Sequence, residues 1–138
     1  MKIAVVYFAV NKKDKMLGIA RNLAQGLEYQ GHSVDIIDGE RESHTKLSIY
    51  QYIAVGSVSI GMLGGKVPPQ VSHFLANAGM IGGKRCFAFT MKQGLRPQKT
   101  LRTLMAAMEK EGLYLKFSEI FSDQDEALSV GKRLHVAV

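Results

Sequence analysis

The sequence predicts an α/β fold, a three-layer doubly wound arrangement in which helices cover both faces of a five-stranded parallel sheet. Short apolar runs without polar alternation, such as residues 3–8 and 52–57, are typical of strands that are buried on both faces. Segments with apolar residues at every third or fourth position alternate with these runs along the chain. Five strands joined in this way favour the strand order 2-1-3-4-5 with right-handed crossovers.

Strands and helices are expected to alternate through the whole chain, and only the second helix is reduced, to a turn or two around residues 45–49. The second strand is shorter and more polar than the first, which places it near a sheet edge. The expected strands are residues 3–8, 33–38, 52–57, 86–90 and 113–121. The expected helices run from about 15 to 29, from Pro68 to Gly79, from Pro97 to Gly112, and onward from a cap at Ser122 or Asp123.

The chain has 138 residues, which is enough for a single domain over residues 1–138 with a substantial core. No segment approaches the ~20 consecutive apolar residues that a membrane span needs, and the first apolar run has no cleavage site after it, which points to the cytoplasm. The single cysteine, Cys86, lies in an apolar run and is expected to be an inert core residue.

The formal net charge of +6 predicts attraction to something anionic. The basic residues are spread over the sequence, for example at 12–15, 84–85 and 132–133, and acidic residues occur between these groups. No aromatic residues lie between them to stack on bases, so nucleic acid is an unlikely partner and a solvated basic surface is the simpler interpretation.

Three loops are expected to form a ligand crevice, because the carboxyl ends of parallel strands share one edge of the sheet. These loops are residues 9–15, 58–67 and 91–96. The first loop leads into a helix, whose first N–H groups have no partner within the helix and can bind an anion. The four histidines have no metal-ligand spacing, so no metal site is expected.

Residues 52–75 resemble the third strand and the flavin-ring loop of the flavodoxin family, with Gly56-Ser57 at the end of the strand and Phe74-Leu75 in the following helix. Residues 1–8 and 20–27 resemble the first strand and helix of that family, so the resemblance covers essentially the whole chain. It implies non-covalent FMN and electron transfer, with a redox protein or a pyridine nucleotide as partner and no catalytic side chain. A homodimer is a further possibility.

The resemblance also implies where the cofactor would bind. The phosphate would lie on the first loop, at Ala9, Val10, Asn11, Lys12, Lys13, Asp14 and Lys15. One side of the flavin ring would contact Ser57, Val58, Ser59, Ile60, Gly61 and Met62. The other side would contact Thr90, Met91, Lys92, Gln93 and Gly94. The side chains offered to the ring are mainly aliphatic or Met, where flavodoxins usually present aromatic rings.

The first loop departs from the family, whose phosphate loop carries Ser and Thr around a glycine. Residues 9–14 contain neither a hydroxyl group nor a glycine. Asp14 is expected to cap the helix with its own carboxylate and to repel a phosphate by about 2–3 kcal/mol per unit charge. Lys12, Lys13 and Lys15 would offset that repulsion in a salt-sensitive way.

Two functions therefore remain open from the sequence. One is a flavodoxin-like protein that binds FMN for electron transfer or flavin-dependent reduction. The other is a binding or scaffold module that has kept this fold and lost FMN affinity. A general polyanion binder is a third possibility, and it rests on the net charge alone.

Overall fold

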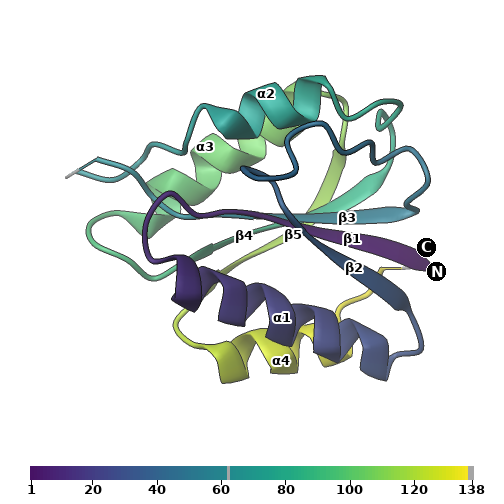
Figure 1. Ribbon diagram of the computed structural model, residues 1–138. Helices are drawn as coiled ribbons and strands as arrows, with labels where there is room; N and C mark the ends of the chain where they lie inside the picture. The colour runs from purple at the N-terminus through teal and green to yellow at the C-terminus, as the bar shows by residue number, and fades with distance from the viewer. Residues whose placement is uncertain (62, 137–138) are drawn as a thin grey trace.

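The computed structural model describes residues 1–61 and 63–136, and these form a five-stranded sheet in the order β2-β1-β3-β4-β5 (Figure 1). Each neighbouring pair of strands is parallel, so the predicted topology is confirmed. The strands are β1 (Lys2–Phe8), β2 (Ser33–Asp38), β3 (Tyr52–Ser57), β4 (Arg85–Met91) and β5 (Tyr114–Phe121).

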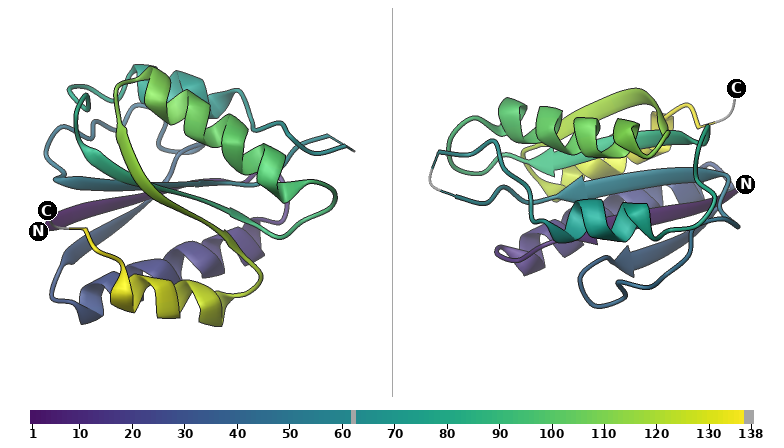
Figure 2. Two further views of the ribbon diagram at one scale, coloured as in Figure 1. Left: turned by 180° about the vertical axis from the view of Figure 1, so that it is seen from behind. Right: turned by 90° about the horizontal axis from the view of Figure 1, so that it is seen from above.

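The helices form a layer on each face of the sheet (Figures 1 and 2). One layer contains α1 and α4, and the other contains α2 and α3. The helices are α1 (Lys13–Tyr29), α2 (Gln70–Ala76), α3 (Pro97–Lys110) and α4 (Gln124–Arg133). The central strands β1, β3 and β4 deliver their side chains alternately to the two cores and are almost fully buried, whereas the edge strands β2 and β5 are more polar and more exposed.

The segment between β2 and β3 does not form the expected turn or two of helix around residues 45–49. Residues 39–44 and 48–49 form turns instead. The N–H of Leu47 donates to the carbonyl of Ala78 beyond the end of α2, at 2.7 Å, so the backbone pairs with a distant segment instead of with itself. Leu47 and Tyr50 are buried, and this loop supplies the cover that a helix would otherwise give.

Two helix starts differ from the sequence prediction. Helix α1 begins at Lys13, two residues earlier than expected, and α2 begins at Gln70 because Pro69 is its N-cap. The expected cap of α4 is confirmed, since Asp123 Oδ1 accepts a hydrogen bond of 2.9 Å from the N–H of Glu126.

Two features show how closely the interior is packed. Helices α1 and α4 approach closely where Gly26 meets Gly131, and a Cβ on Gly26 would lie only 2.6 Å from the carbonyl oxygen of Leu128. Cys86 is fully buried, as expected, and burial raises the pKa of its thiol to about 12. Such a thiol carries almost no thiolate at neutral pH.

None of the helices in residues 1–61 and 63–136 combines the length and the apolar character that crossing a membrane requires.

Candidate functional site

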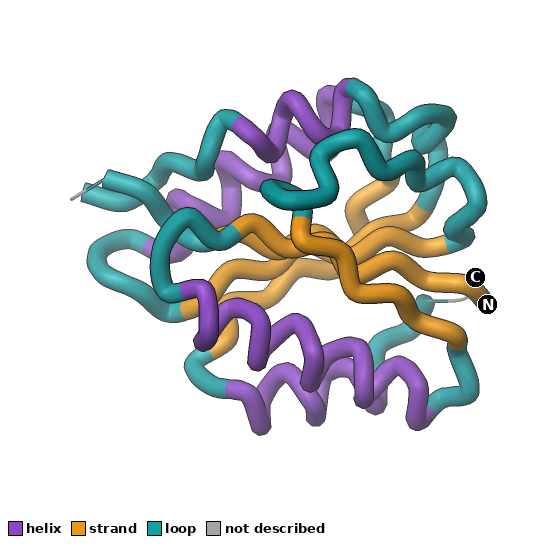
Figure 3. The backbone as a smooth tube through the Cα atoms, in the orientation of Figure 1, coloured by secondary structure: helices purple, strands orange, loops and turns teal. Residues whose placement is uncertain are grey.

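The loops that follow β1, β3 and β4 meet at the carboxyl edge of the sheet, where Figure 3 shows them beside the first turn of α1. The β1–α1 loop is residues 9–12, the β3–α2 loop is residues 58–69, and the β4–α3 loop is residues 92–96. The parallel order 2-1-3-4-5 places the reversal point between β1 and β3, which is where such folds bind ligands. The predicted crevice loops are thus brought together.

Side chains from each of these loops bridge to one another. Gln93 Nε2 donates to Asn11 Oδ1 at 2.7 Å, and Gln93 Oε1 accepts from the N–H of Ser59 at 3.2 Å. Asn11 Nδ2 in turn donates to the carbonyl of Ser59 at 3.3 Å. We refer to Asn11, Ser59 and Gln93 as the amide bridge. These contacts use Asn11 Oδ1 and one of the two N–H groups on Nδ2, so only one side-chain N–H of Asn11 remains to donate to a phosphate.

The β3–α2 loop is also fastened to α3 and to the loop before it. Thr100 Oγ1 accepts from the N–H of Gly65 at 3.0 Å, and it donates to Ser59 Oγ at 3.0 Å. Gly64 has φ +70° and packs so tightly on the carbonyl of Leu95 that a Cβ would overlap it. The second and third loops are therefore in direct backbone contact with each other.

The N-terminus of α1 has an open first turn. Its N-cap is Lys12, in the left-handed conformation with φ 49°, and no side chain of the described residues caps the helix. The expectation that Asp14 caps the helix is wrong, because the earlier start places Asp14 inside the first turn, where it is exposed. The first helical N–H groups lack intrahelical partners, and Lys12 and Lys15 are exposed beside them.

Lys13 is engaged elsewhere, because its Nζ forms an ion pair of 3.1 Å with Asp38 Oδ2. Asp38 Oδ1 also accepts from the N–H groups of Glu40 and Arg41, and Tyr7 Oη donates to Oδ2 at 3.3 Å. Burial alone would raise the pKa of Asp38, but the hydrogen bonds from Lys13 and from these N–H groups outweigh it and hold the pKa below its usual value. Asp38 thus fixes the turn after β2 and ties it to α1.

Several residues predicted to contact the flavin belong to the core. Met91 is the last residue of β4 and is 1% exposed, packed with the residues under α1 and α4, so the expectation that it lines the third loop is wrong. Thr90 Oγ1 donates to the carbonyl of Ser57 at 2.7 Å, and Ser57 Oγ donates to the carbonyl of Val58 at 2.9 Å. These hydroxyls are satisfied within the fold. Ala9 and Val58 are buried as well.

The remaining predicted residues lie at the surface of the loops. Ile60 is half-buried and its N–H donates to the carbonyl of Lys66. Those that are exposed are Val10, Asn11, Lys12, Lys13, Asp14, Lys15, Gly61, Lys92 and Gly94. Met62 lies outside the described residues.

The structure gathers the charge that looked scattered in the sequence. Residues 9–15, 58–69 and 91–99 hold seven of the chain's 18 Lys and Arg residues but only one of its 12 Asp and Glu residues. The net charge of these three segments, +6, equals that of the whole chain. The sequence alone gives this charge distribution, but it can be recognised only when the three loops are known to lie at the same edge of the sheet.

Apolar side chains protrude among these basic ones, with Val10 45%, Leu63 67% and Leu95 57% exposed. We refer to the exposed basic and apolar residues that protrude from these segments as the carboxyl-edge face, leaving out Lys13 because it is ion-paired with Asp38. It consists of Val10, Lys12, Lys15, Leu63, Lys66, Lys92, Leu95, Arg96 and Lys99. Five of these, Leu63, Lys66, Leu95, Arg96 and Lys99, were not among the predicted site residues.

No family model and no curated protein matches the chain, but solved structures do. Oxidised flavodoxin 1 from Bacillus cereus superposes with a TM-score of 0.72 at 16% identity, covering 98% of this chain and 100% of that one. The fold is flavodoxin-like. Flavodoxin 2 from Bacillus cereus gives a TM-score of 0.74 at 16% identity, covering 96% and 93%. A flavodoxin from the domain Archaea gives 0.65 at 20% identity, covering 97% and 93%.

A flavodoxin-like fold raises the question of whether FMN fits these residues. The phosphate end has a plausible place at the open first turn of α1 beside Lys12 and Lys15. The flavin ring has no comparable place, because the Gln93 side chain joins the first and second loops and Gly64 packs on the carbonyl of Leu95. In the described part of the chain these contacts hold the loops against one another, so a flat ring would fit between the second and third loops only if they separated.

Proposed function

We propose that this chain is a flavodoxin-like binding module whose carboxyl-edge face docks on an acidic protein surface without the help of a flavin. The observation that carries the proposal is the concentration of basic residues at one edge of the sheet, where residues 9–15, 58–69 and 91–99 together carry a net charge of +6. Opposite charges across an interface speed encounter and select the partner. An acidic partner surface would be complementary to this face.

The composition of the face supports protein docking over the capture of a small ion. Val10, Leu63 and Leu95 are exposed among the basic side chains. Apolar contacts inside a polar rim are typical of protein interfaces. The amide bridge and the Gly64–Leu95 contact hold the loops in one arrangement, so less ordering entropy is lost on binding.

FMN-dependent electron transfer or reduction is the second candidate, and the open first turn of α1 favours it. The uncapped N–H groups beside Lys12 and Lys15 would hold a phosphate. When bound, FMN would supply the redox chemistry, and a redox protein or a pyridine nucleotide would exchange electrons with it. This candidate requires the amide bridge to open and the second and third loops to separate.

A charge-swap comparison tests the leading proposal. The probe is a fluorescein-labelled decaglutamate peptide, and binding is followed by anisotropy at low salt. We expect replacement of Lys15, Lys66 and Lys92 by Glu to lower the affinity more than tenfold. The matched control replaces Lys110, Lys116 and Arg133 by Glu, which changes the net charge equally but at the opposite edge of the sheet, and it should retain most of the affinity.

Three results would count against the proposal. Equal losses in the two variants would show that only the net charge matters. Tighter binding of a DNA oligonucleotide with the same number of charges would indicate a general polyanion site. A purified protein that is yellow with bound FMN would favour the second candidate.

A further inference from the structure

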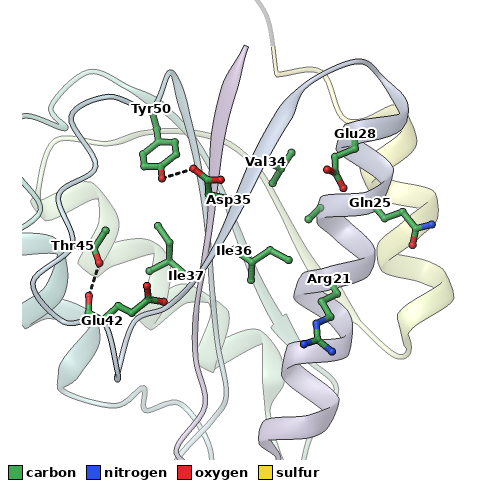
Figure 4. Close-up of a pocket in the computed structure, with 11 residues that line it drawn as sticks. Arg21, Gln25, Glu28, Val34, Asp35, Ile36, Ile37, Glu42, Thr45 and Tyr50 are labelled. Carbon is green, nitrogen blue, oxygen red and sulfur yellow. Dashed lines mark hydrogen bonds between the residues drawn. The ribbon is translucent and has the colours of Figure 1, made fainter.

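The free edge of β2 lies in a groove that is separate from the carboxyl-edge face. Within residues 1–61 and 63–136, strand β2 pairs only with β1, and no strand lies along its other edge. A groove of about 830 Å³ is lined by side chains from both faces of β2 and therefore wraps around that edge. Figure 4 shows its two walls, with Arg21, Gln25 and Glu28 of α1 on one side and Glu42, Thr45 and Tyr50 of the following loop on the other.

The backbone of β2 offers unused hydrogen-bonding groups to this groove. The N–H of Ser33 donates to Met1 at 3.0 Å and that of Gly39 donates to Tyr7 at 2.9 Å, so the odd-numbered residues face β1. The even-numbered residues face outward. The outward N–H of Asp38 donates to Glu42 Oε2 at 3.0 Å, which leaves Val34 and Ile36 as the open positions.

The two sides of the edge differ in chemistry. On the α1 side, Val34 and Ile36 of the strand present apolar surface, and the polar Arg21, Gln25 and Glu28 of α1 form the wall beyond them (Figure 4). Ile36 is 37% exposed. On the loop side, Asp35 and Glu42 present carboxylates, and Tyr50 Oη donates to Asp35 Oδ2 at 2.7 Å. A strand placed beside β2 would direct alternate side chains to these two sides.

We propose that this groove binds an extended segment of another protein that alternates apolar and basic residues and adds to the sheet as a sixth strand. Backbone hydrogen bonds to Val34 and Ile36 give affinity, as in other cases of strand addition, and the alternation gives specificity. Apolar side chains of the segment face Val34 and Ile36, and basic ones face Asp35 and Glu42.

Charge argues against a second copy of this chain as the occupant. The residues that line the groove include three acidic ones, Glu28, Asp35 and Glu42, and one basic one, Arg21. The groove is therefore acidic, although the net charge of the chain is positive. If the β2 edges of two copies paired, the acidic residues of one copy would lie opposite those of the other, and like charges on paired strands are unfavourable. A basic segment meets the opposite sign. It is also repelled by the carboxyl-edge face, which limits binding at the wrong place.

Binding of a defined peptide tests the proposal. The probe is a fluorescein-labelled octapeptide of four Lys-Val repeats with blocked ends, measured by anisotropy with the full chain. We expect saturable binding that weakens at least tenfold when alternate peptide amides are N-methylated, because methylation removes the ladder hydrogen bonds. A peptide of four Lys followed by four Val has the same composition without the alternation, and it should bind at least tenfold more weakly.

Substitutions in β2 locate the site. Ile36→Pro removes an outward N–H at an edge position where proline is tolerated, and it should abolish binding, whereas Ile36→Val should not. Asp35→Asn preserves an acceptor for Tyr50 while removing one charge, and it should lower the affinity severalfold with a normal circular dichroism spectrum. Failure of the wild type to bind, or equal binding by Ile36→Pro, would overturn the proposal. A wild-type dimer that Ile36→Pro dissociates would assign this edge to a second copy instead.

Discussion

Replacement of Gln93 by Ala removes the residue that joins the first and second loops. Gln93 donates to Asn11 at 2.7 Å and accepts from the N–H of Ser59 at 3.2 Å. Because one of these hydrogen bonds is exposed and the other is only partly buried, each contributes about 0.5–1 kcal/mol net. The variant should therefore lose about 1–2 kcal/mol of unfolding free energy, provided that the third contact, from Asn11 to Ser59, persists.

The same substitution should raise the affinity for FMN. A flat ring can enter only when the amide bridge opens, so the free energy of opening is subtracted from the free energy of binding. Removing a cost of about 1–2 kcal/mol strengthens binding by about 5- to 30-fold. Stability and FMN affinity should thus change in opposite directions and by similar free energies.

Urea denaturation gives the first quantity, and equilibrium dialysis against FMN gives the second. Gln98→Ala is the matched control, because Gln98 is exposed in the first turn of α3 and belongs to no part of the amide bridge. The reasoning is refuted if Gln93→Ala loses stability while its FMN affinity stays unchanged or falls. That outcome would mean that the bridge does not close a ring site.

Three further predictions concern α1 and its neighbours. Asp14→Thr should tighten FMN binding severalfold, because it removes an exposed carboxylate from the open first turn, and an unchanged or lower affinity in the same dialysis would contradict this. Gly26→Ala should cost about 1–3 kcal/mol in urea denaturation, since its Cβ would lie 2.6 Å from the carbonyl oxygen of Leu128. Gly18→Ala, which meets only the flexible end of Gln124, should be tolerated. The pKa of Asp38 is lowered in the folded state, so its stabilisation is present above the unfolded value of 3.8 and is lost as the pH falls through the lower folded value. The stability difference between wild type and Asp38→Asn should therefore narrow below about pH 3.8.

The strand order was predictable because it follows from features that are local in the sequence. Apolar runs and helical periodicity alternate clearly enough to define five strands, and parallel connection then restricts the topology. The segment between β2 and β3 was not predictable in the same way. Its conformation depends on the hydrogen bond from Leu47 to Ala78, which lies 31 residues away and leaves no local pattern.

The location of the site was predictable, but its internal contacts were not. Parallel topology alone brings the loops after β1, β3 and β4 together. The amide bridge depends on how far Asn11 and Gln93 reach, and they are 82 residues apart. The burial of Met91 did have a signal, because Met91 continues the two-residue alternation of Phe87 and Phe89, which point into the core under α1 and α4.

The charge of the chain shows most clearly what the fold adds. The basic residues of the carboxyl-edge face come from three separate parts of the sequence, namely Lys12 with Lys15, Lys66, and Lys92 with Arg96. They become one basic face only because strands β1, β3 and β4 end at the same edge. Composition alone does not reveal this basic face, whereas the order of the strands brings its three parts together.

The visible absorbance of the freshly purified protein, followed by an FMN titration, tests the central claim most directly. The claim is that the amide bridge and the Gly64–Leu95 contact close the ring site and leave the carboxyl-edge face for an acidic partner. We predict a colourless protein that does not quench the fluorescence of FMN at micromolar concentrations. Flavin absorbance bands in the purified protein, or tight quenching, would contradict the claim and assign the crevice to flavin chemistry.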